Sequence, residues 1–404
     1  MYGTGPRREM IRASAVGGGV GTADNSGVSG GSGSAVGSRA DGGIGKGVGG
    51  RRMPARAPVR MPVRALAGRV HEAGSLCTVP SVSSVPSAPR PAAPRLSDVL
   101  AALDALWPPE RAEQWDAVGT VCGDPDAPVT RVLFAVDPVQ DIADEAVRLG
   151  ADLIVTHHPL YLRGTTTVAA STFKGRVVHT LIKNDIALHV AHTNADTADP
   201  GVSDALAGAL DLRIVGPLVP DPTDASGRRG LGRICELDRP ATLRDFAARV
   251  AHRLPATAQG IRIAGDLDAL VRTVAVSGGS GDSLFDQVRA AGVDVFLTAD
   301  LRHHPASEAV AQAVSQAVAQ TVSQTVSPAV SPAGSDPSEH PQRSPLGLID
   351  AAHWATEWPW CEQAAAQLDE ISDRHGWDLR VHVSNTVTDP WSAHLAPATS
   401  GAPN

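Results

Sequence analysis

Two adjacent histidines, His157 and His158, directly follow a short apolar run, residues 153–156. The run is too short for an ordinary helix and lies between Gly150 and Pro159, which predicts a buried parallel strand. Open α/β sheets carry their chemistry at the carboxyl ends of the strands, so both imidazoles could turn into one crevice. The alternative for such a pair is that one ring caps the end of the sheet and the other is solvated.

Two later segments each place a histidine four residues before a carboxylate. His192 precedes Asp196, and His353 precedes Glu357, in both cases where an apolar run ends. Three or more imidazoles with two carboxylates form a ligand set for zinc, manganese or iron rather than for calcium. The set exceeds the needs of one tetrahedral ion, and a carboxylate can bridge. The pattern therefore favours a pair of divalent ions about 3.5–4 Å apart, which would activate water for hydrolysis.

The elements that must position these side chains alternate between strand and helix. Strands expected at residues 132–137, 153–156 and 186–196 are separated by helical segments, which predicts a parallel sheet. A second set of helices and strands follows, and its segment from Asp286 aligns with the segment from Glu145. We therefore expect an α/β fold of two similar lobes, an internal repeat, with the metal site in the cleft between them.

Composition divides the chain further. Residues rich in Gly, Ser and Pro cannot bury enough apolar surface to offset chain entropy, so such segments are expected to be disordered. In the stretch rich in Ala, Val, Ser and Gln, valine recurs every four residues, so part of that stretch could extend the preceding helix. The expected parts are a disordered tail at 1–95, a first lobe at 96–225, a second lobe at 226–390 interrupted by a low-complexity insertion at about 309–345, and a loose tail at 391–404.

Charge and cysteine content limit the partners. The first 95 residues carry 13 Lys and Arg against 4 Asp and Glu, whereas the whole chain has a net charge of −8, so the remainder carries −17. An acidic body argues against a nucleic-acid groove. No segment approaches the roughly 20 apolar residues of a membrane span. The 4 cysteines lie far apart and form no CxxC pair, which fits a reduced cytoplasmic protein and excludes a thiolate zinc site.

Several motifs together resemble a known family. These are HHPL after an apolar strand, HT-x-x-D downstream, and a late DA-x-H-x-x-x-E. AEQWDAVGTVCGD is similar to the family's AE-x-WDN-x-G segment, with Ala117 in place of Asn, and LTADLRHHPASEA to its TGD-x-x-x-H segment, with Ala299 in place of Gly. The family is the dinuclear-metal-centre group of GTP cyclohydrolase I type 2 homologues (Nif3-like). The resemblance covers most of residues 96 to 390.

The resemblance implies a two-lobed α/β unit that assembles into a homohexameric ring. It also implies two divalent metal ions per chain, of the Zn, Mn or Fe type, and a nucleotide or other small phosphate compound as substrate. His192 is implied to be either a further ligand or a partner that holds Asp196. The residues carried over as metal ligands are His157, His158, Asp196, His353 and Glu357.

Two classes of function follow from this resemblance. The first is a metal-dependent hydrolase resembling GTP cyclohydrolase I type 2, which acts on GTP or a related nucleotide or phosphate compound through a metal-activated water. The alternative is a metal-binding regulatory or scaffold protein without turnover. The hydrolase is favoured because carboxylate-rich sites without thiolates tend to keep a position open for water.

Three other features are weaker candidates. His303 and His304 could line the cleft and touch substrate, or could form a solvated pair in a loop. The turn at residues 277–283, which contains Gly279, joins a strand to a helix start, where free N–H groups favour phosphate. It lacks the lysine of a P-loop, and a glycine-rich turn alone is a weak indication. A tryptophan cluster at residues 354–360 is expected to serve packing, with base stacking as the alternative.

Overall fold

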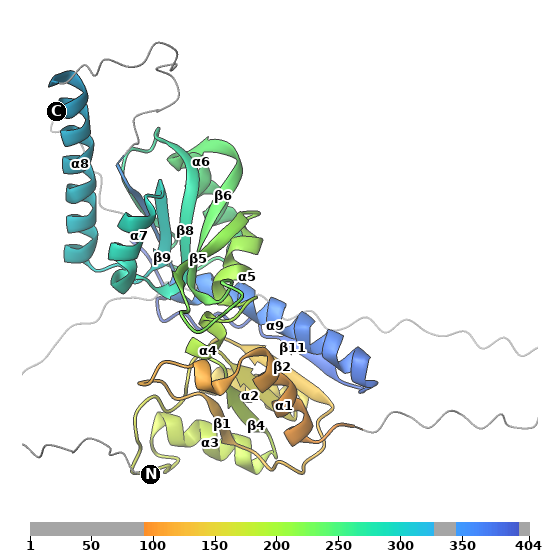
Figure 1. Ribbon diagram of the computed structural model, residues 1–404. Coiled ribbons are helices and arrows are strands. Elements are labelled where there is room, and N and C mark those ends of the chain that lie inside the picture. The colour runs from red at the N-terminus through yellow and green to blue at the C-terminus, as the bar shows by residue number, and fades with distance from the viewer. Residues whose placement is uncertain (1–92, 327–344, 396–404) are drawn as a thin grey trace, which may run out of the picture. The chain divides into compact units, whose positions relative to one another are not determined.

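The apolar runs of the first half of the chain form the parallel centre of a five-stranded sheet (Figure 1). Its strands lie in the order β1 (Gly119–Cys122), β4 (Ala187–Val190), β3 (Leu153–Thr156), β2 (Arg131–Ala135) and β11 (Arg380–Val383). β2, β3 and β4 pair in parallel, which confirms the predicted strand–helix alternation. β11 adds a further parallel strand beside β2, and β1 runs antiparallel to β4.

The helices of this half connect the strands and cover the sheet. The connection between β2 and β3 is α2 (Gln140–Leu149), which ends because Gly150 takes the left-handed conformation, with φ at 63°. In α3 (Phe173–Lys183) the hydroxyl of Thr172 accepts a hydrogen bond from the Gly175 N–H and caps the helix start. The remaining elements are α1 (Leu96–Leu106), η1 (Pro109–Arg111), α4 (Thr193–Asp196) and α5 (Val202–Ala209).

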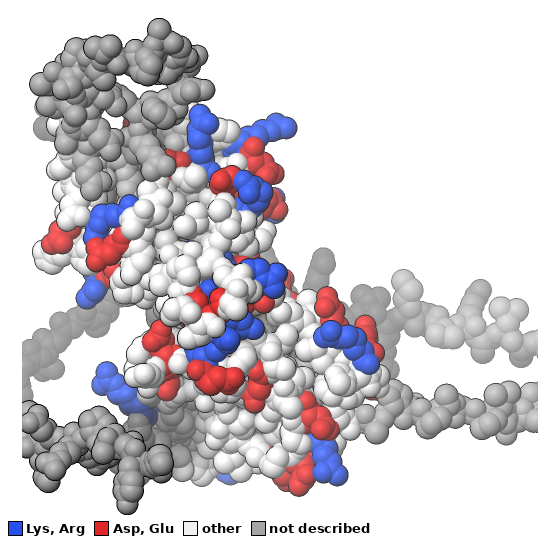
Figure 2. All heavy atoms as spheres, viewed as in Figure 1, with Lys and Arg blue, Asp and Glu red and all other residues white. Residues whose placement is uncertain are grey.

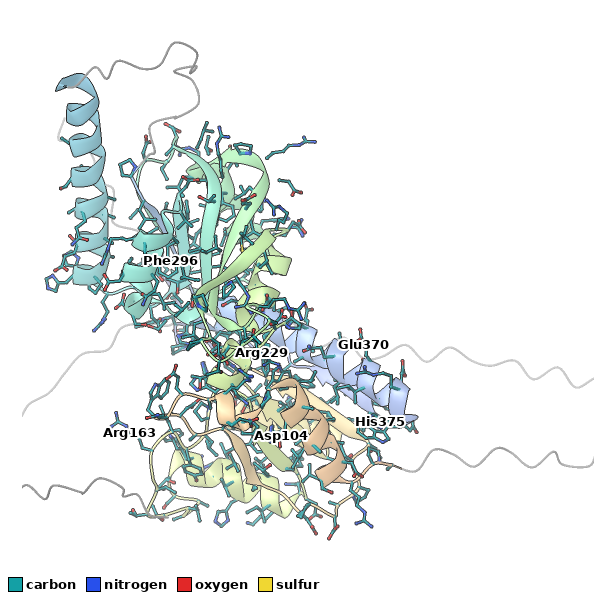
Figure 3. All side chains as sticks on the ribbon, in the orientation of Figure 1. Asp104, Arg163, Arg229, Phe296, Glu370 and His375 are labelled. Carbon is teal, nitrogen blue, oxygen red and sulfur yellow. The ribbon has the colours of Figure 1, made fainter. Side chains whose placement is uncertain are left out.

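A second, six-stranded sheet has the order β5 (Arg213–Pro220), β6 (Gly230–Thr242), β8 (Leu270–Ser280), β9 (Val295–Ala299), β10 (Gly347–Ala351) and β7 (Arg262–Ala264). β8, β9 and β10 are parallel, and the other pairs are antiparallel. Phe296 on β9 is fully buried in its core (Figure 3). Its helices are α6 (Leu243–Arg253), η2 (Asp282–Leu284), α7 (Phe285–Ala291), α8 (His303–Val326) and α9 (His353–His375).

The two sheets divide the chain differently from the expected lobes. β5 lies in the range assigned to the first lobe, yet it pairs with β6 of the second sheet. β11 lies in the range assigned to the second lobe, yet it pairs with β2 of the first sheet. Both are edge strands of their sheets, and the pairing of an edge strand depends on backbone hydrogen bonds that its side-chain pattern specifies only weakly.

The parallel cores of the two sheets share local features. α2 and α7 both end at a left-handed glycine, Gly150 with φ at 63° and Gly292 with φ at 60°. Two residues further on, Asp152 accepts hydrogen bonds from two consecutive backbone N–H groups and a threonine hydroxyl at the start of β2. Asp294 accepts the same three kinds of hydrogen bond at the start of β8. These carboxylates fasten each β-α-β unit in the same way.

Helix α9 packs against both sheets. It contacts β8 on one side and β2 and β11 on the other. Trp360 is fully buried, with its ring centroid 5.1 Å from that of Trp107 and 6.3 Å from that of Phe134. Because proline favours the first position of a helix, Pro359 in the sequence predicts a helix start near that residue. The helix in fact begins six residues earlier and contains the proline. The earlier start is decisive for the site, because it places His353 and Glu357 in the first turn.

The computed structural model describes residues 93–326 and 345–395, which all belong to one compact unit. Residues 1–92 of the expected disordered tail, residues 327–344 of the expected insertion and residues 396–404 of the expected loose tail lie outside these ranges. Residues 309–326, the first part of the insertion expected at about 309–345, are helical, because α8 continues to Val326. None of the described helices is long and apolar enough to cross a bilayer. On the face drawn in Figure 2, acidic and basic side chains are interspersed.

One buried histidine of the first sheet predicts acid sensitivity of the fold. His189 on β4 is 3% exposed, and burial lowers the pKa of its imidazole to about 4. Its Nδ1 lies 3.2 Å from the hydroxyl of Thr120. The carboxylate of Asp104 on α1 (labelled in Figure 3) lies 3.8 Å from Nε2, but it is half exposed, so solvent screens its charge and burial dominates.

The folded protein therefore resists protonation of His189, whereas the unfolded chain accepts a proton near pH 6.5. Above that pH the residue is neutral in both states and does not affect the free energy of unfolding. As the pH falls toward 4, proton uptake by the unfolded chain lowers the free energy of unfolding. We expect this decrease to be roughly 2.5 kcal/mol at pH 4.5. Urea unfolding at pH 7 and pH 4.5 should show a smaller loss in His189→Asn than in the natural chain. Equal losses in the two proteins would contradict the prediction.

Candidate metal centre

Four histidines emerge where parallel strands end. His157 and His158 follow β3, and His192 follows β4 and precedes the single turn of α4. His353 follows β10 and opens α9. The carboxyl ends of these strands carry the candidate side chains, as the sequence predicts. The first turn of each following helix, α4 and α9, then places a carboxylate near the histidine four residues before it.

The predicted ligand atoms lie close together. Glu357 is at the centre: its Oε1 is 2.9 Å from His353 Nε2, and its Oε2 is 3.1 Å from His158 Nε2. His157 Nε2 lies 3.5 Å from Glu357 Oε1 and 3.7 Å from Asp196 Oδ1. The Nε2 atoms of His158 and His353 are 3.2 Å apart although 195 positions separate the residues in the chain.

Two overlapping groups of three side chains have the composition and spacing of metal-binding groups. One group is His157, His158 and His192, and the other is His158, His353 and Glu357. Within each group the candidate ligand atoms all lie within 4.8 Å of one another. His158 belongs to both groups.

Each ring is oriented by an acceptor on its other nitrogen. The Nδ1 atom of His158 lies 2.7 Å from Asp137, and that of His353 lies 2.7 Å from Asp300. His157 Nδ1 lies 3.0 Å from a backbone oxygen, that of Ala191. Acceptors at Nδ1 keep a proton there and direct the Nε2 lone pair toward the centre, which is the usual arrangement of metal-binding histidines.

His192 is held by a residue other than the one considered in the sequence. Its Nδ1 lies 2.8 Å from Asp116 Oδ1, and the other oxygen of Asp116 accepts from the Thr193 backbone N–H at 3.0 Å. Asp116 is fully buried at its side chain. Burial raises its pKa, but hydrogen bonds from His192 and Thr193 outweigh that effect and hold the pKa well below its usual range. His192 therefore pairs with Asp116, and its free Nε2 is available as a ligand.

Sequence reasoning did not identify these three orienting carboxylates. Asp116 stands in the WD pair of the N-terminal motif, and Asp137 and Asp300 stand shortly after the strands β2 and β9. A strand-end position was the available indication for Asp137 and Asp300. Their role depends on contacts with His158 and His353, and strand positions alone do not specify such contacts.

The histidines and carboxylates of the cluster stabilise one another's charged forms. Burial opposes protonation of His158, but the charge of Glu357 and the hydrogen bond to Asp137 outweigh it and raise the pKa of the imidazole to about 10. The pKa of His353 is raised to about 11 against the same opposition, by Glu357 and Asp300. Burial raises the pKa of Glu357 too, but the three nearby histidines outweigh it and hold the pKa well below its usual range. A charged Glu357 thus needs positive partners, either protons or metal ions.

The donor set fits divalent metal ions. His157 is 1% exposed, and its Nε2 has no hydrogen-bond partner. Leaving a buried polar atom unpaired costs about 1–3 kcal/mol, so an atom of this kind indicates a missing partner. Asp137 and Asp300 hold the Nδ1 sides of His158 and His353, and the two Nε2 atoms face each other at 3.2 Å, where two lone pairs or two N–H groups would repel each other. Metal coordination by these nitrogens would remove both problems, and imidazole and carboxylate suit zinc, manganese or iron.

A pocket of about 410 Å³ opens onto the cluster. Its mouth carries Trp115, which is 59% exposed and stands edge-on to the His192 ring. Gly279 forms part of its wall, with φ at 65°. A Cβ atom at that position would come within 2.4 Å of Glu357 Oε1, so only glycine allows the backbone to approach the cluster. The hydroxyl-bearing Ser280 and Ser283 line the same pocket.

The second histidine pair lies elsewhere. His303 and His304 begin α8, are exposed, and do not line the 410 Å³ pocket. His303 lines a different pocket of about 540 Å³, together with Arg262 and Asp350. The tryptophan cluster serves packing in the main: Trp354 and Trp360 are buried, and Trp358 donates a hydrogen bond to a backbone oxygen.

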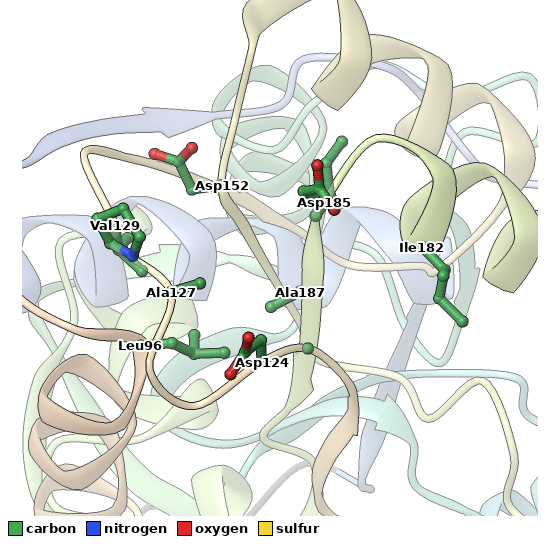
Figure 4. A pocket seen from close by; sticks show the side chains of 11 residues that line it. Leu96, Asp124, Ala127, Val129, Asp152, Ile182, Asp185 and Ala187 are labelled. Carbon is green, nitrogen blue, oxygen red and sulfur yellow. The ribbon is translucent and has the colours of Figure 1, made fainter.

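The largest of these pockets is remote from the histidines. It has a volume of about 630 Å³ and lies where β3 and β4 begin, at the opposite end of the strands (Figure 4). Asp124, Asp152 and Asp185 stand around it with apolar side chains such as Leu96 and Ile182. It shares no residue with the histidine cluster, so a choice of site by pocket volume alone would have missed the candidate metal centre.

The chain is an α/β protein with two mixed sheets. Histidines and a glutamate gather where the parallel strands of these sheets end. The chain belongs to the Duf34/NIF3 (NGG1p interacting factor 3) family, whose model matches residues 94–320. This confirms the family resemblance seen in the motifs.

Similar proteins agree with this placement. A protein of Streptomyces coelicolor named GTP cyclohydrolase 1 type 2 homolog is 73% identical over 315 residues, which cover 77% of this chain and all of that protein. A protein of the same name from Mycobacterium bovis is 35% identical, covering 74% of this chain and 97% of its own. The solved structure of a hypothetical protein of Staphylococcus aureus has a TM-score of 0.62 at 26% identity, covering 74% of this chain and 99% of that one.

Proposed function

We propose that the chain is a dinuclear metal-dependent hydrolase that acts on GTP or a related nucleotide or phosphate compound. The observation that carries the proposal is the convergence of four imidazoles and two carboxylates, of which all but the buried His157 line one pocket, with each ring oriented from its far side. The names of the relatives from Streptomyces coelicolor and Mycobacterium bovis support the nucleotide as substrate class. The predicted residues would hold two ions: His157, His158, His192, Asp196, His353 and Glu357.

When bound, a pair of divalent ions supplies Lewis acidity and lowers the pKa of water. The protein's own part is orientation. Asp137, Asp300 and Asp116 hold three rings by their Nδ1 atoms, so that the Nε2 atoms keep one geometry. The backbone at Gly279 narrows the pocket beside Glu357. The serine hydroxyls of the wall can donate to a polar substrate.

We also infer that the two sheets derive from one repeated unit. The matching features are the left-handed glycines, the aspartates that fasten β2 and β8, and the equivalent positions of the two His-x-x-x-carboxylate segments. In such a repeat His192 corresponds to His353, and Asp196 to Glu357. Each copy would then contribute one imidazole and one carboxylate to a shared centre.

Metal-dependent turnover tests the function. With Zn²⁺, Mn²⁺ or Fe²⁺ loaded, the chain should hydrolyse GTP or at least one of a panel of phosphoesters, and a chelator should remove the activity. His158→Ala should lose it, because His158 belongs to both ligand groups. His304→Ala is the matched control, since that exposed histidine lies outside the pocket. Full metal occupancy with no turnover across the panel would overturn the hydrolase and favour a metal-binding regulator.

A further inference from the structure

The residues that follow β11 return to the candidate metal centre. We call residues 384–391 the C-terminal strap. Its first residue, Ser384, is 2% exposed and donates its backbone N–H to the Phe134 oxygen at 2.8 Å, which prolongs the β11–β2 pairing. The hydroxyls of Ser384 and Thr386 both donate to Glu145 Oε2, at 2.6 and 2.9 Å. The strap is thereby fixed to the first sheet and to helix α2.

The strap also contacts the helix that carries Glu357. The indole N–H of Trp358 donates to the Ser384 backbone oxygen at 2.8 Å. Trp358 is the next residue after Glu357 in α9. The start of the strap is therefore held between β2, which Asp137 follows shortly, and α9, which carries Glu357.

Four residues beyond Ser384, the strap reaches a carboxylate that orients a ring. The Thr388 hydroxyl donates to Asp137 Oδ2, while Asp137 Oδ1 lies 2.7 Å from His158 Nδ1. The two oxygens of Asp137 thus have separate partners, one on the strap and one on the ring. A carboxylate rotates about its terminal bond in a broad energy well, so the hydrogen bond from Thr388 fixes the plane in which Asp137 meets the imidazole.

We propose that Thr388 is a positioning residue for His158 that acts through Asp137, and that the C-terminal strap is part of the metal centre. The inference rests on the proposed metal site for its consequence, but its geometry is independent of which substrate is used. Loss of an outer partner of a metal ligand costs about 10–100-fold in metal affinity. Thr388 is one contact further from the ligand, so the low end of that range applies.

The test compares three strap variants of the full chain. Thr388→Val keeps the side-chain shape but removes the donor, Thr388→Ser keeps the donor, and Thr386→Val removes a hydrogen bond to Glu145 at the same strap. Competition with a chromogenic chelator should show the Zn²⁺ Kd rising about tenfold in Thr388→Val. Thr388→Ser should restore nearly natural affinity, and Thr386→Val should retain it. An equal rise in the two valine variants would overturn the proposal, because it would reflect general loosening of the strap.

A second measurement separates this inference from the proposed function. In the metal-free chain, NMR should detect the hydrogen-bonded Nδ1–H proton of His158 far downfield. In Thr388→Val that signal should move upfield and exchange faster with water, and in Thr386→Val it should be unchanged. An unchanged signal in Thr388→Val would overturn the positioning role. If the natural chain bound no Zn²⁺ while the signal responded as expected, the metal centre would fall and the role of Thr388 toward His158 would stand.

Asp137 provides the final check. If Thr388 acts only through this carboxylate, Thr388→Val should have no additional effect in an Asp137→Asn background. The coupling between the two changes should therefore be as large as the effect of Thr388→Val alone. Additive effects would overturn the proposed route through Asp137.

Discussion

Replacing Glu357 with glutamine is expected to abolish tight binding of the proposed metal pair. Glu357 is 3% exposed and touches three imidazoles, with its two oxygens directed at His353 and His158. Glutamine has nearly the same shape but no charge, so the imidazoles would face two divalent ions with one negative charge fewer. Outer partners of ligands are worth about 10–100-fold in affinity, and the loss of a charged ligand itself should exceed that range.

The measurement is the number of ions per chain after dialysis, with affinity from chelator competition. The natural chain should hold about two ions, and Glu357→Gln should retain at most one, weakly held. Glu362→Gln is the control, because Glu362 lies on the same helix and is exposed. Both ions at natural affinity in Glu357→Gln would reduce the site to a centre built from His157, His158 and Asp196. The prediction that the second sheet contributes a ligand to the metal centre would then be wrong.

The strands at the core of each sheet could be predicted from the sequence because they are apolar throughout. β3 and β9 are fully buried, and a short apolar run between turn residues has few other structures open to it. The histidines after β3 could then be placed at a strand end without any knowledge of their neighbours. The predictions of the fold class and of the candidate ligands depended on this local information.

The remaining features depended on contacts between distant residues. β11 joins β2 across about 250 positions, and none of its residues is buried, so no apolar run marks it in the sequence. Asp116, Asp137 and Asp300 orient histidines that lie 76, 21 and 53 positions away. Aspartates after strands are common, so no spacing distinguishes these three. The start of α9 was misplaced for a different reason, since Pro359 favours a first-turn position yet lies inside the helix.

Arg233→Met is expected to cost about 3–5 kcal/mol of unfolding free energy. Arg233 on β6 is 1% exposed, and its guanidinium makes two hydrogen bonds to Asp204, at 2.8 and 2.5 Å. Its other donors reach the backbone oxygens of Gly230, Gly232 and Ala198. Methionine fills much of the space but leaves Asp204 as a buried carboxylate without its cation, and three carbonyls without a donor.

Urea unfolding of the metal-free chain at neutral pH measures the loss. Domains are stable by about 5–15 kcal/mol, so the expected change is a large share of the total. The matched surface change is Arg244→Met, whose pairing with Asp268 at 3.4 Å is exposed on both sides and should matter by less than about 1 kcal/mol.

Adding Asp204→Asn to Arg233→Met should recover part of the loss, because the amide removes the unpaired charge while its oxygen can still accept from the Gly201 N–H. No recovery in the double variant would show that the lost hydrogen bonds to the carbonyls, rather than the unpaired charge of Asp204, account for most of the lost stability.

Arg233 also donates a hydrogen bond to the backbone oxygen of Gly232, which lines the 410 Å³ pocket. We therefore expect Arg233→Met to weaken substrate binding, measured as a higher KM, at temperatures where the chain is still folded. An unchanged KM at those temperatures would show that Arg233 stabilises the second sheet without shaping the pocket.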